Sequence, residues 1–151
     1  MSDAMNTEFS SEELLSQAQG NATALALAAI AYLKDQNLSA NEFFKFVGER
    51  FAPGWDELRG RSTEDVARTV ALNMVSVGGS LRTLSGDDNH AEVLIAGWPA
   101  SETLSELELT QSESDALWHI FEPIMEYLGI RYAWQRQDEA VKMTLERETP
   151  E

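Results

Sequence analysis

"GGSLRTLSGDDNHAEVLIAGWP", residues 78–99, is the stretch that decides the fold. Two short segments, "SLRTLSG" and "AEVLIAG", flank the polar run "DDNH". Here the apolar spacing changes from a helical period to the period of two that is typical of β-strands. Asp and Asn favour tight turns, because they accept left-handed backbone geometry or bond to their own main chain. We therefore predict a β-hairpin with residues 87–90 at its tip and with Trp98-Pro99 ending its second strand.

The polar tip also raises the alternative of a metal site or a catalytic loop. Asp87, Asp88 and His90 gather oxygen and nitrogen donors within a few residues. A calcium loop, however, needs ligands at alternating positions and a later bidentate Glu. "DDNHAEVL" does not supply that pattern, so we favour the turn and predict no metal site.

Helical periodicity precedes the hairpin in three segments. Residues 10–37 predict a helix broken near Gly20-Asn21, and residues 39–51 predict one that Ser39 and Glu42 begin as a capping box. The buried face of that second helix is predicted to carry four apolar residues: Phe43, Phe46, Val47 and Phe51. Residues 62–79 predict a third helix, which Ser62 or Thr63 caps and which ends at Gly78-Gly79.

Helix and strand patterns return after the hairpin. Ser112 with Asp115 predicts the start of a helix through "ESDALWHIFEPIMEYLG". Pro123 should kink this helix unless it lies in the opening turn of a second segment. Apolar and polar residues alternate over residues 130–147, which predicts a second hairpin with its bend at residues 137–139.

This order of elements predicts an α+β fold: N-terminal helices, then a β-hairpin, a helix and a β-hairpin, with both hairpins in one antiparallel sheet covered by helices. We expect a single domain over residues 12–148 and a flexible N-terminus over residues 1–11.

Composition excludes several classes of function. The 151 residues carry 26 Asp and Glu against 11 Lys and Arg, a net charge of −15 that repels nucleic acids and anionic membranes. The absence of cysteine excludes disulfides, thiolate nucleophiles and Cys-ligated zinc. The longest apolar run, residues 22–33, is too short to span a bilayer. We therefore expect a cytoplasmic protein. We also expect no cofactor, since no glycine-rich phosphate loop is present.

A few side chains are candidates for binding or chemistry. His119 lies three residues before Glu122 on the predicted helix and could act as an acid or base or as a hydrogen-bond donor to a ligand, although a helical His is more often a boundary residue. Arg82, like Arg68 a rare cation here, could anchor a ligand carboxylate, although an internal salt bridge is commoner. Three tryptophans could line a pocket or simply form core: Trp98, Trp118 and Trp134.

The element order also resembles a known family. "GGSLRTLSGDDNHAEVLIAGWP" followed by "LWHIFEPIMEYLGIRYAW" resembles the 4-vinyl reductase domain and its relatives, including the family related to L-2-amino-thiazoline-4-carboxylic acid hydrolase. The resemblance implies a small-molecule-binding or sensor domain, frequently dimeric, with a pocket between helices and sheet. Many members carry cysteines, some of which bind metal, and neither feature carries over to this cysteine-free chain.

We therefore expect a sensor-like domain that binds a small-molecule ligand between sheet and helices and forms a homodimer. The expected ligand-binding residues are Arg82, Trp98, Trp118, His119 and Trp134. The alternatives are a metal-free hydrolase-like enzyme, with His119 and Glu122 as acid and base, and an acidic protein-interaction module. The expected dimer surface is the Ala-rich helix around Leu25, Leu27 and Ile30.

Overall fold

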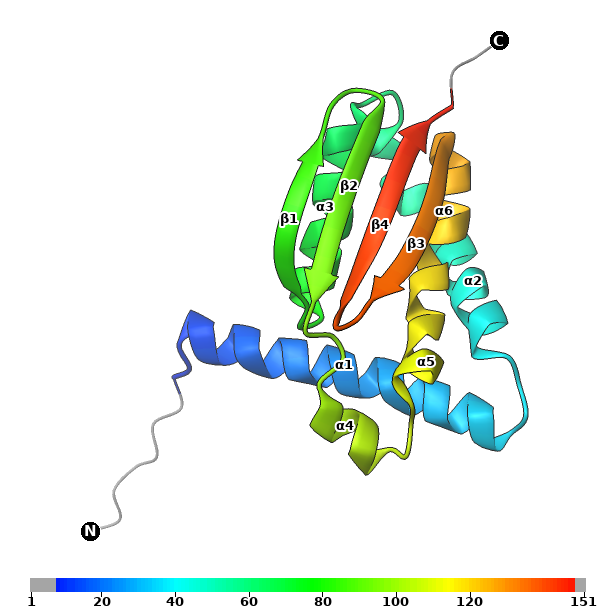
Figure 1. Ribbon diagram of the computed structural model, residues 1–151. Coiled ribbons are helices and arrows are strands. Elements are labelled where there is room, and N and C mark those ends of the chain that lie inside the picture. Colours follow the sequence, from blue (N-terminus) through cyan, green and yellow to red (C-terminus); the bar gives the residue numbers. More distant parts are fainter. Residues whose placement is uncertain (1–7, 149–151) are drawn as a thin grey trace.

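The computed structural model describes residues 8–148 and has the predicted α+β fold (Figure 1). The elements follow one another as α1 (Ser11–Asp35), α2 (Ala40–Phe51), the 3-10 helix η1 (Ala52–Leu58), α3 (Thr63–Ser76), β1 (Ser80–Gly86), β2 (His90–Ala96), α4 (Ser101–Glu106), α5 (Gln111–Ser114), the 3-10 helix η2 (Asp115–Ile120), α6 (Phe121–Leu128), β3 (Ile130–Gln137) and β4 (Ala140–Arg147). Both predicted hairpins are confirmed.

The two hairpins join into one antiparallel sheet with the strand order β1-β2-β4-β3. The central strands β2 and β4 bury every second residue, among them Val93 and Met143, which lie opposite each other and are both fully buried. Polar residues alternate with them, and Lys142 on the other face forms an ion pair with Glu92 at 3.3 Å. One face of the sheet therefore holds the core and the other carries charge.

Helices cover the apolar face of the sheet. Figure 1 shows α3 behind β1 and β2, and α6 and α2 on the side of β3. The approach of α2 to η2 and α6 is very close at Gly48, where an added Cβ would lie 2.1 Å from the carbonyl oxygen of Ile120. Helix α1 crosses one end of the sheet, where it contacts several other helices.

The tip of the first hairpin is a structural turn that also caps a helix. The Asp87 carboxylate accepts hydrogen bonds from the backbone N–H groups of Asn89 and His90, which lower the pKa of Asp87. The Asp88 carbonyl accepts from the N–H and the hydroxyl of Thr63, and the Asp87 carbonyl accepts from the Glu64 N–H. The turn thus satisfies free N–H groups at the start of α3. Among residues 8–148, no group of three His, Asp or Glu side chains is placed to hold a metal ion.

Helix α1 is continuous, so the predicted break near Gly20-Asn21 is wrong. Two side chains that flank these residues tie α1 to the end of α3: Gln19 donates to the Val75 carbonyl at 2.8 Å, and the buried Thr23 hydroxyl donates to the Val77 carbonyl. These tertiary contacts outweigh the low helix propensity of one glycine. The helix begins at Ser11, and the prediction of a flexible N-terminus falls largely on residues 1–7, outside the described residues.

Two predicted helix faces are also wrong. In α2 the buried aromatic residue is Phe44, whereas Phe46 and Phe51 are 51% and 58% exposed. In α1 the residues Leu27 and Ile30 are buried against the rest of the chain and cannot form part of a dimer surface, whereas Leu25 is 73% exposed. Amphipathic spacing defines a stripe on a helix, but the neighbouring elements decide which stripe is covered.

The helix after α4 begins two residues earlier than predicted. Thr110 and Glu113 form its capping box, not Ser112 and Asp115. The segment then divides into α5, η2 and α6, so that Pro123 lies in the first turn of α6, where its missing N–H has no helical partner to lose. Gly129, with a φ of 72°, ends α6.

Candidate ligand-binding site

A groove runs between α3 and β1, at the free edge of the sheet. Its volume is about 380 Å³, within the range typical of ligand sites. Its lining is largely apolar and consists of Arg68, Thr69, Ala71, Leu72, Val75, Leu81 and Leu84. Leu72 and Leu81 are 68% and 42% exposed, so the groove offers apolar surface that water now covers.

Local structure explains why these residues meet. Arg68, Leu72 and Val75 recur at four- and three-residue spacing along α3 and therefore share one face of that helix. The chain then turns at Gly78, which has a φ of 104°, and enters β1. Because β1 pairs only with β2 in the sheet, its outer edge leaves room beside α3.

Two arginines at this edge have no partner among the residues that the structure describes. The guanidinium groups of Arg68, which lines the groove, and of Arg82 make no hydrogen bond, ion pair or ring contact within residues 8–148. Every other lysine or arginine of the chain contacts an acid, an aromatic ring or a backbone carbonyl. In a chain with net charge −15, two unpaired cations on adjacent elements are unusual.

Arg82 occupies an irregular position of β1. It lies where the register between β1 and β2 shifts, between Leu81 and Thr83, and it is exposed. A bulge of this kind turns a side chain away from the regular alternation of a strand. The predicted internal salt bridge is absent within the described residues, and Arg82 follows a groove residue directly in the sequence.

The predicted tryptophans lie elsewhere: Trp98 and Trp118 in the core, and Trp134 half-buried against it. The rings of Trp98 and Trp118 meet edge to face with centroids 5.7 Å apart, and both side chains are buried. The indole N–H of Trp98 has no partner within residues 8–148. Trp134 packs edge to face on the His119 ring, with centroids 5.8 Å apart. None of these four residues lines the α3–β1 groove, so the predicted site residues do not form one pocket with Arg82.

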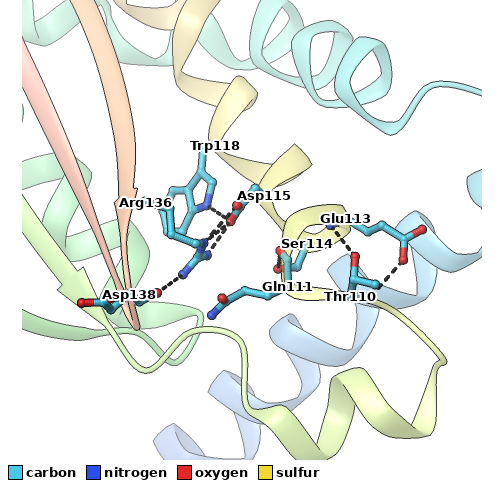
Figure 2. Close-up of polar contacts among 8 residues, drawn as sticks. All are labelled: Thr110, Gln111, Glu113, Ser114, Asp115, Trp118, Arg136 and Asp138. Atoms are coloured by element: carbon cyan, nitrogen blue, oxygen red, sulfur yellow. Dashed lines mark hydrogen bonds and ion pairs between the residues drawn. The ribbon is translucent and has the colours of Figure 1, made fainter.

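A buried polar network holds Trp118 in place (Figure 2). The Asp115 carboxylate accepts from the Trp118 indole N–H at 3.0 Å and from the guanidinium group of Arg136, whose Nε lies 3.0 Å from both carboxylate oxygens. The Arg136 and Asp115 side chains are only 16% and 13% exposed. The network joins η2 to the end of β3, and its groups satisfy one another.

Sequence reasoning did not identify this ion pair. The signal was present, because Arg136 follows Tyr132 and Trp134 at two-residue spacing and therefore points to the same, covered face of β3. An arginine on the covered face of a strand needs a carboxylate nearby. The Arg136–Asp115 pair is a structural feature, because the two charges already neutralise each other.

His119 and Glu122 are adjacent, as their spacing predicted. The His119 Nδ1 lies 2.8 Å from the Glu122 carboxylate, whose other oxygen lies 3.7 Å from the Lys45 ammonium group. A carboxylate at Nδ1 fixes the ring orientation and leaves Nε2 available for a proton or a ligand. The His119 side chain is 19% exposed, so the group is reachable from solvent.

Tyr132, on the same face of β3 as Trp134, is half-buried and packs against the core. Its hydroxyl donates to the Trp118 carbonyl at 3.0 Å. Burial, with a smaller contribution from the charge of Glu122, raises the pKa of Tyr132 well above its ordinary value. At neutral pH this hydroxyl is protonated and serves as a structural donor.

A second cavity, of about 210 Å³, lies among the helices. It is lined by Phe51, Trp55, Asn73, Met74, Val77, Leu117, Ile120, Phe121 and Ile124. It contains no charged group that could orient a ligand. Other grooves include Arg61 or Lys34, but these cations pair with Asp65 and Glu113. Arg68 in the α3–β1 groove has no such partner within the described residues. We therefore take the α3–β1 groove as the candidate site.

Comparisons with known proteins leave the family open. No protein-family model and no curated protein matches the sequence. One similar solved structure is a trafficking protein particle complex subunit 3 from Naegleria fowleri covalently bound to palmitic acid, with a TM-score of 0.45 and 12% identity over 90% of this chain and 94% of that one. A likeness at this level carries no argument about function, and the resemblance to the 4-vinyl reductase group stays a prediction. No helix within residues 8–148 is both long enough and apolar enough to cross a bilayer.

Proposed function

We propose that this protein is a binding domain for a small amphipathic carboxylate, an apolar molecule with one acid group, in the α3–β1 groove. The observation that carries the proposal is the unpaired Arg68 guanidinium beside exposed Leu72 and Leu81. The groove lies between a helix and the edge strand of the sheet.

Two physical terms favour such a ligand. Its apolar body would remove the exposed leucine side chains from water, at about 25 cal/mol for each Å² of apolar surface buried. Its carboxylate would accept charge-assisted hydrogen bonds from Arg68, which contribute about 1.5–3 kcal/mol each. The Arg82 guanidinium, also free and on the neighbouring strand, would add long-range attraction.

The net charge of −15 repels an anionic ligand, so this repulsion has to be compared with the attraction of the local guanidinium group. At physiological ionic strength, charges more than about 8 Å away are largely screened, whereas a guanidinium in contact with the ligand is not. The local cation therefore dominates in the groove. Binding should weaken as salt is raised, because the guanidinium lies at the surface.

The test compares naphthylacetate with its uncharged amide by titration of the protein's backbone amide NMR signals. We expect shifts at residues of α3 and β1, and binding of the acid at least about ten-fold tighter than binding of the amide, which corresponds to one charge-assisted hydrogen bond. Arg68→Gln should remove that preference, and the control Arg131→Gln, at an exposed ion pair on β3, should keep it. Equal affinity for acid and amide, or shifts confined to other elements, would refute the proposal.

A second candidate function is general acid–base catalysis, supported by the 2.8 Å contact between His119 and Glu122. The contact orients the imidazole, which could activate a water molecule for hydrolysis without a metal. A broad screen of activated esters with the wild type and with His119→Gln tests it. No turnover by the wild type, or equal turnover by both proteins, would remove this candidate.

A further inference from the structure

The solvent-facing side of α1 is apolar and lacks charge. Leu14, Leu25 and Tyr32 are 57%, 73% and 63% exposed. With the exposed residues Ala18, Asn21 and Ala28 they recur at alternating spacings of four and three residues, which places all six on one stripe. The stripe lies opposite the buried residues Thr23, Leu27 and Ile30. We call these six residues the α1 stripe.

Charge is missing from much more than the stripe. From Leu14 to Leu33, helix α1 carries no Asp, Glu, Lys or Arg, although 25% of the chain is charged. A run of this length with ordinary composition would carry about five charged residues. Only a few residues of this run are buried, so burial within this chain does not explain the missing charges.

We infer that the α1 stripe binds a second copy of this chain. Two molecules with a net charge of −15 repel each other, and the charge-free side of α1 is a surface on which they can meet without opposing like charges. A strongly basic partner would instead be recognised by acidic side chains, which this side of α1 does not have. The small residues Ala18 and Ala28 also permit the close approach of a second helix.

The arrangement of charges at the two ends of α1 favours an antiparallel pair. The acids Glu12 and Glu13 lie in the first turn, whereas the last turn holds both Lys34 and Asp35, and Lys34 already pairs with Glu113. An antiparallel pair keeps the two acidic first turns apart and opposes the two helix dipoles. In this register Leu14 lies opposite Tyr32 of the second copy and Ala18 opposite Ala28. The resulting interface is self-complementary, as two-fold symmetry requires.

This inference is independent of the α3–β1 groove, which contains no residue of α1. The first test is the molar mass of the full chain by light scattering at tens of micromolar. We expect the wild type to be a dimer and Leu25→Glu to be a monomer with an unchanged circular dichroism spectrum. Leu72→Glu introduces the same charge at a similarly exposed leucine of α3 and should remain a dimer.

A cysteine-free chain permits a second test, which does not depend on Leu25→Glu folding. Mild oxidation of an equal mixture of Ala18→Cys and Ala28→Cys proteins should give mainly the mixed disulfide, because these positions face each other across an antiparallel pair. A monomeric wild type, or a Leu25→Glu protein that remains a dimer, would overturn the proposed surface. Disulfides formed mainly within each variant alone would overturn the antiparallel register.

Discussion

Replacement of Gly48 by alanine should destabilise the protein, although alanine is the better helix former. The new Cβ would lie 2.1 Å from the Ile120 carbonyl oxygen and 2.6 Å from the Pro123 Cγ. A carbon next to a carbonyl oxygen normally keeps a distance of about 3.3 Å, so α2 would have to move away from η2 by about 1 Å. The clashing atoms belong to the backbone and to a proline ring, which cannot rotate away as a flexible side chain could.

The expected magnitude follows from two opposing terms. Overpacking of this kind costs about 3 kcal/mol when the neighbour cannot yield, and the gain in helix propensity from Gly to Ala is about 1 kcal/mol. The net loss of about 2 kcal/mol corresponds to a fall in the melting temperature of roughly 4–8 °C for a chain of this size.

The matched control for Gly48→Ala is Gly20→Ala. Gly20 also lies inside a helix, and an added Cβ there meets no atom within 4 Å. This variant should gain about 0.5–1 kcal/mol, because only the propensity term acts. Thermal unfolding by circular dichroism, with urea titrations for the free energy, measures both variants. If Gly48→Ala is as stable as the wild type, the close packing of α2 on η2 is wrong.

Two further predictions concern buried polar groups. Arg136→Gln leaves the Asp115 carboxylate without its cation and should lower the free energy of unfolding in urea by about 3 kcal/mol, whereas Arg131→Gln at the exposed pair should lower it by less than about 1 kcal/mol. Equal losses would show that the first pair is not buried. The raised pKa of Tyr132 stabilises the fold fully below pH 10 and loses this contribution as the pH rises above about 10, because the unfolded chain releases the proton first. Tyr132→Phe should flatten the alkaline fall in unfolding free energy, and Tyr32→Phe should leave it unchanged; a fall of the same steepness in all three proteins would contradict this assignment.

The local pattern of the sequence predicted much of this fold. The period of two in both hairpins, the turn residues between their strands and the capping Ser62 all act over a few residues, so they can be recognised without the tertiary structure. The same is true of His119 and Glu122, because three-residue spacing on a helical segment places them together.

The predictions that were wrong concern features that depend on contacts between distant segments of the chain. Gln19 and Thr23 hold α1 straight through bonds to residues more than 50 positions away, and no local propensity reveals such bonds. The groove depends on β1 being an edge strand, which follows from the strand order and not from the sequence of β1. Trp98 and Trp118 belong to the core and Trp134 packs against it, which is the alternative to a pocket wall that the sequence also allowed.

The cap that the first hairpin provides for α3 also bears on the order of folding. Its bonds from Thr63 to Asp88 close a loop of only 25 residues that holds α3 and β1, and both of these elements contact β2, which follows directly. Closing a short loop loses little chain entropy, so this unit can form early and alone. Pairing β2 with β4 instead joins segments as distant as His90 and Glu146. We therefore expect α3 with its hairpin to act as the nucleus on which the second hairpin docks, and the β2–β4 ladder to set the folding rate.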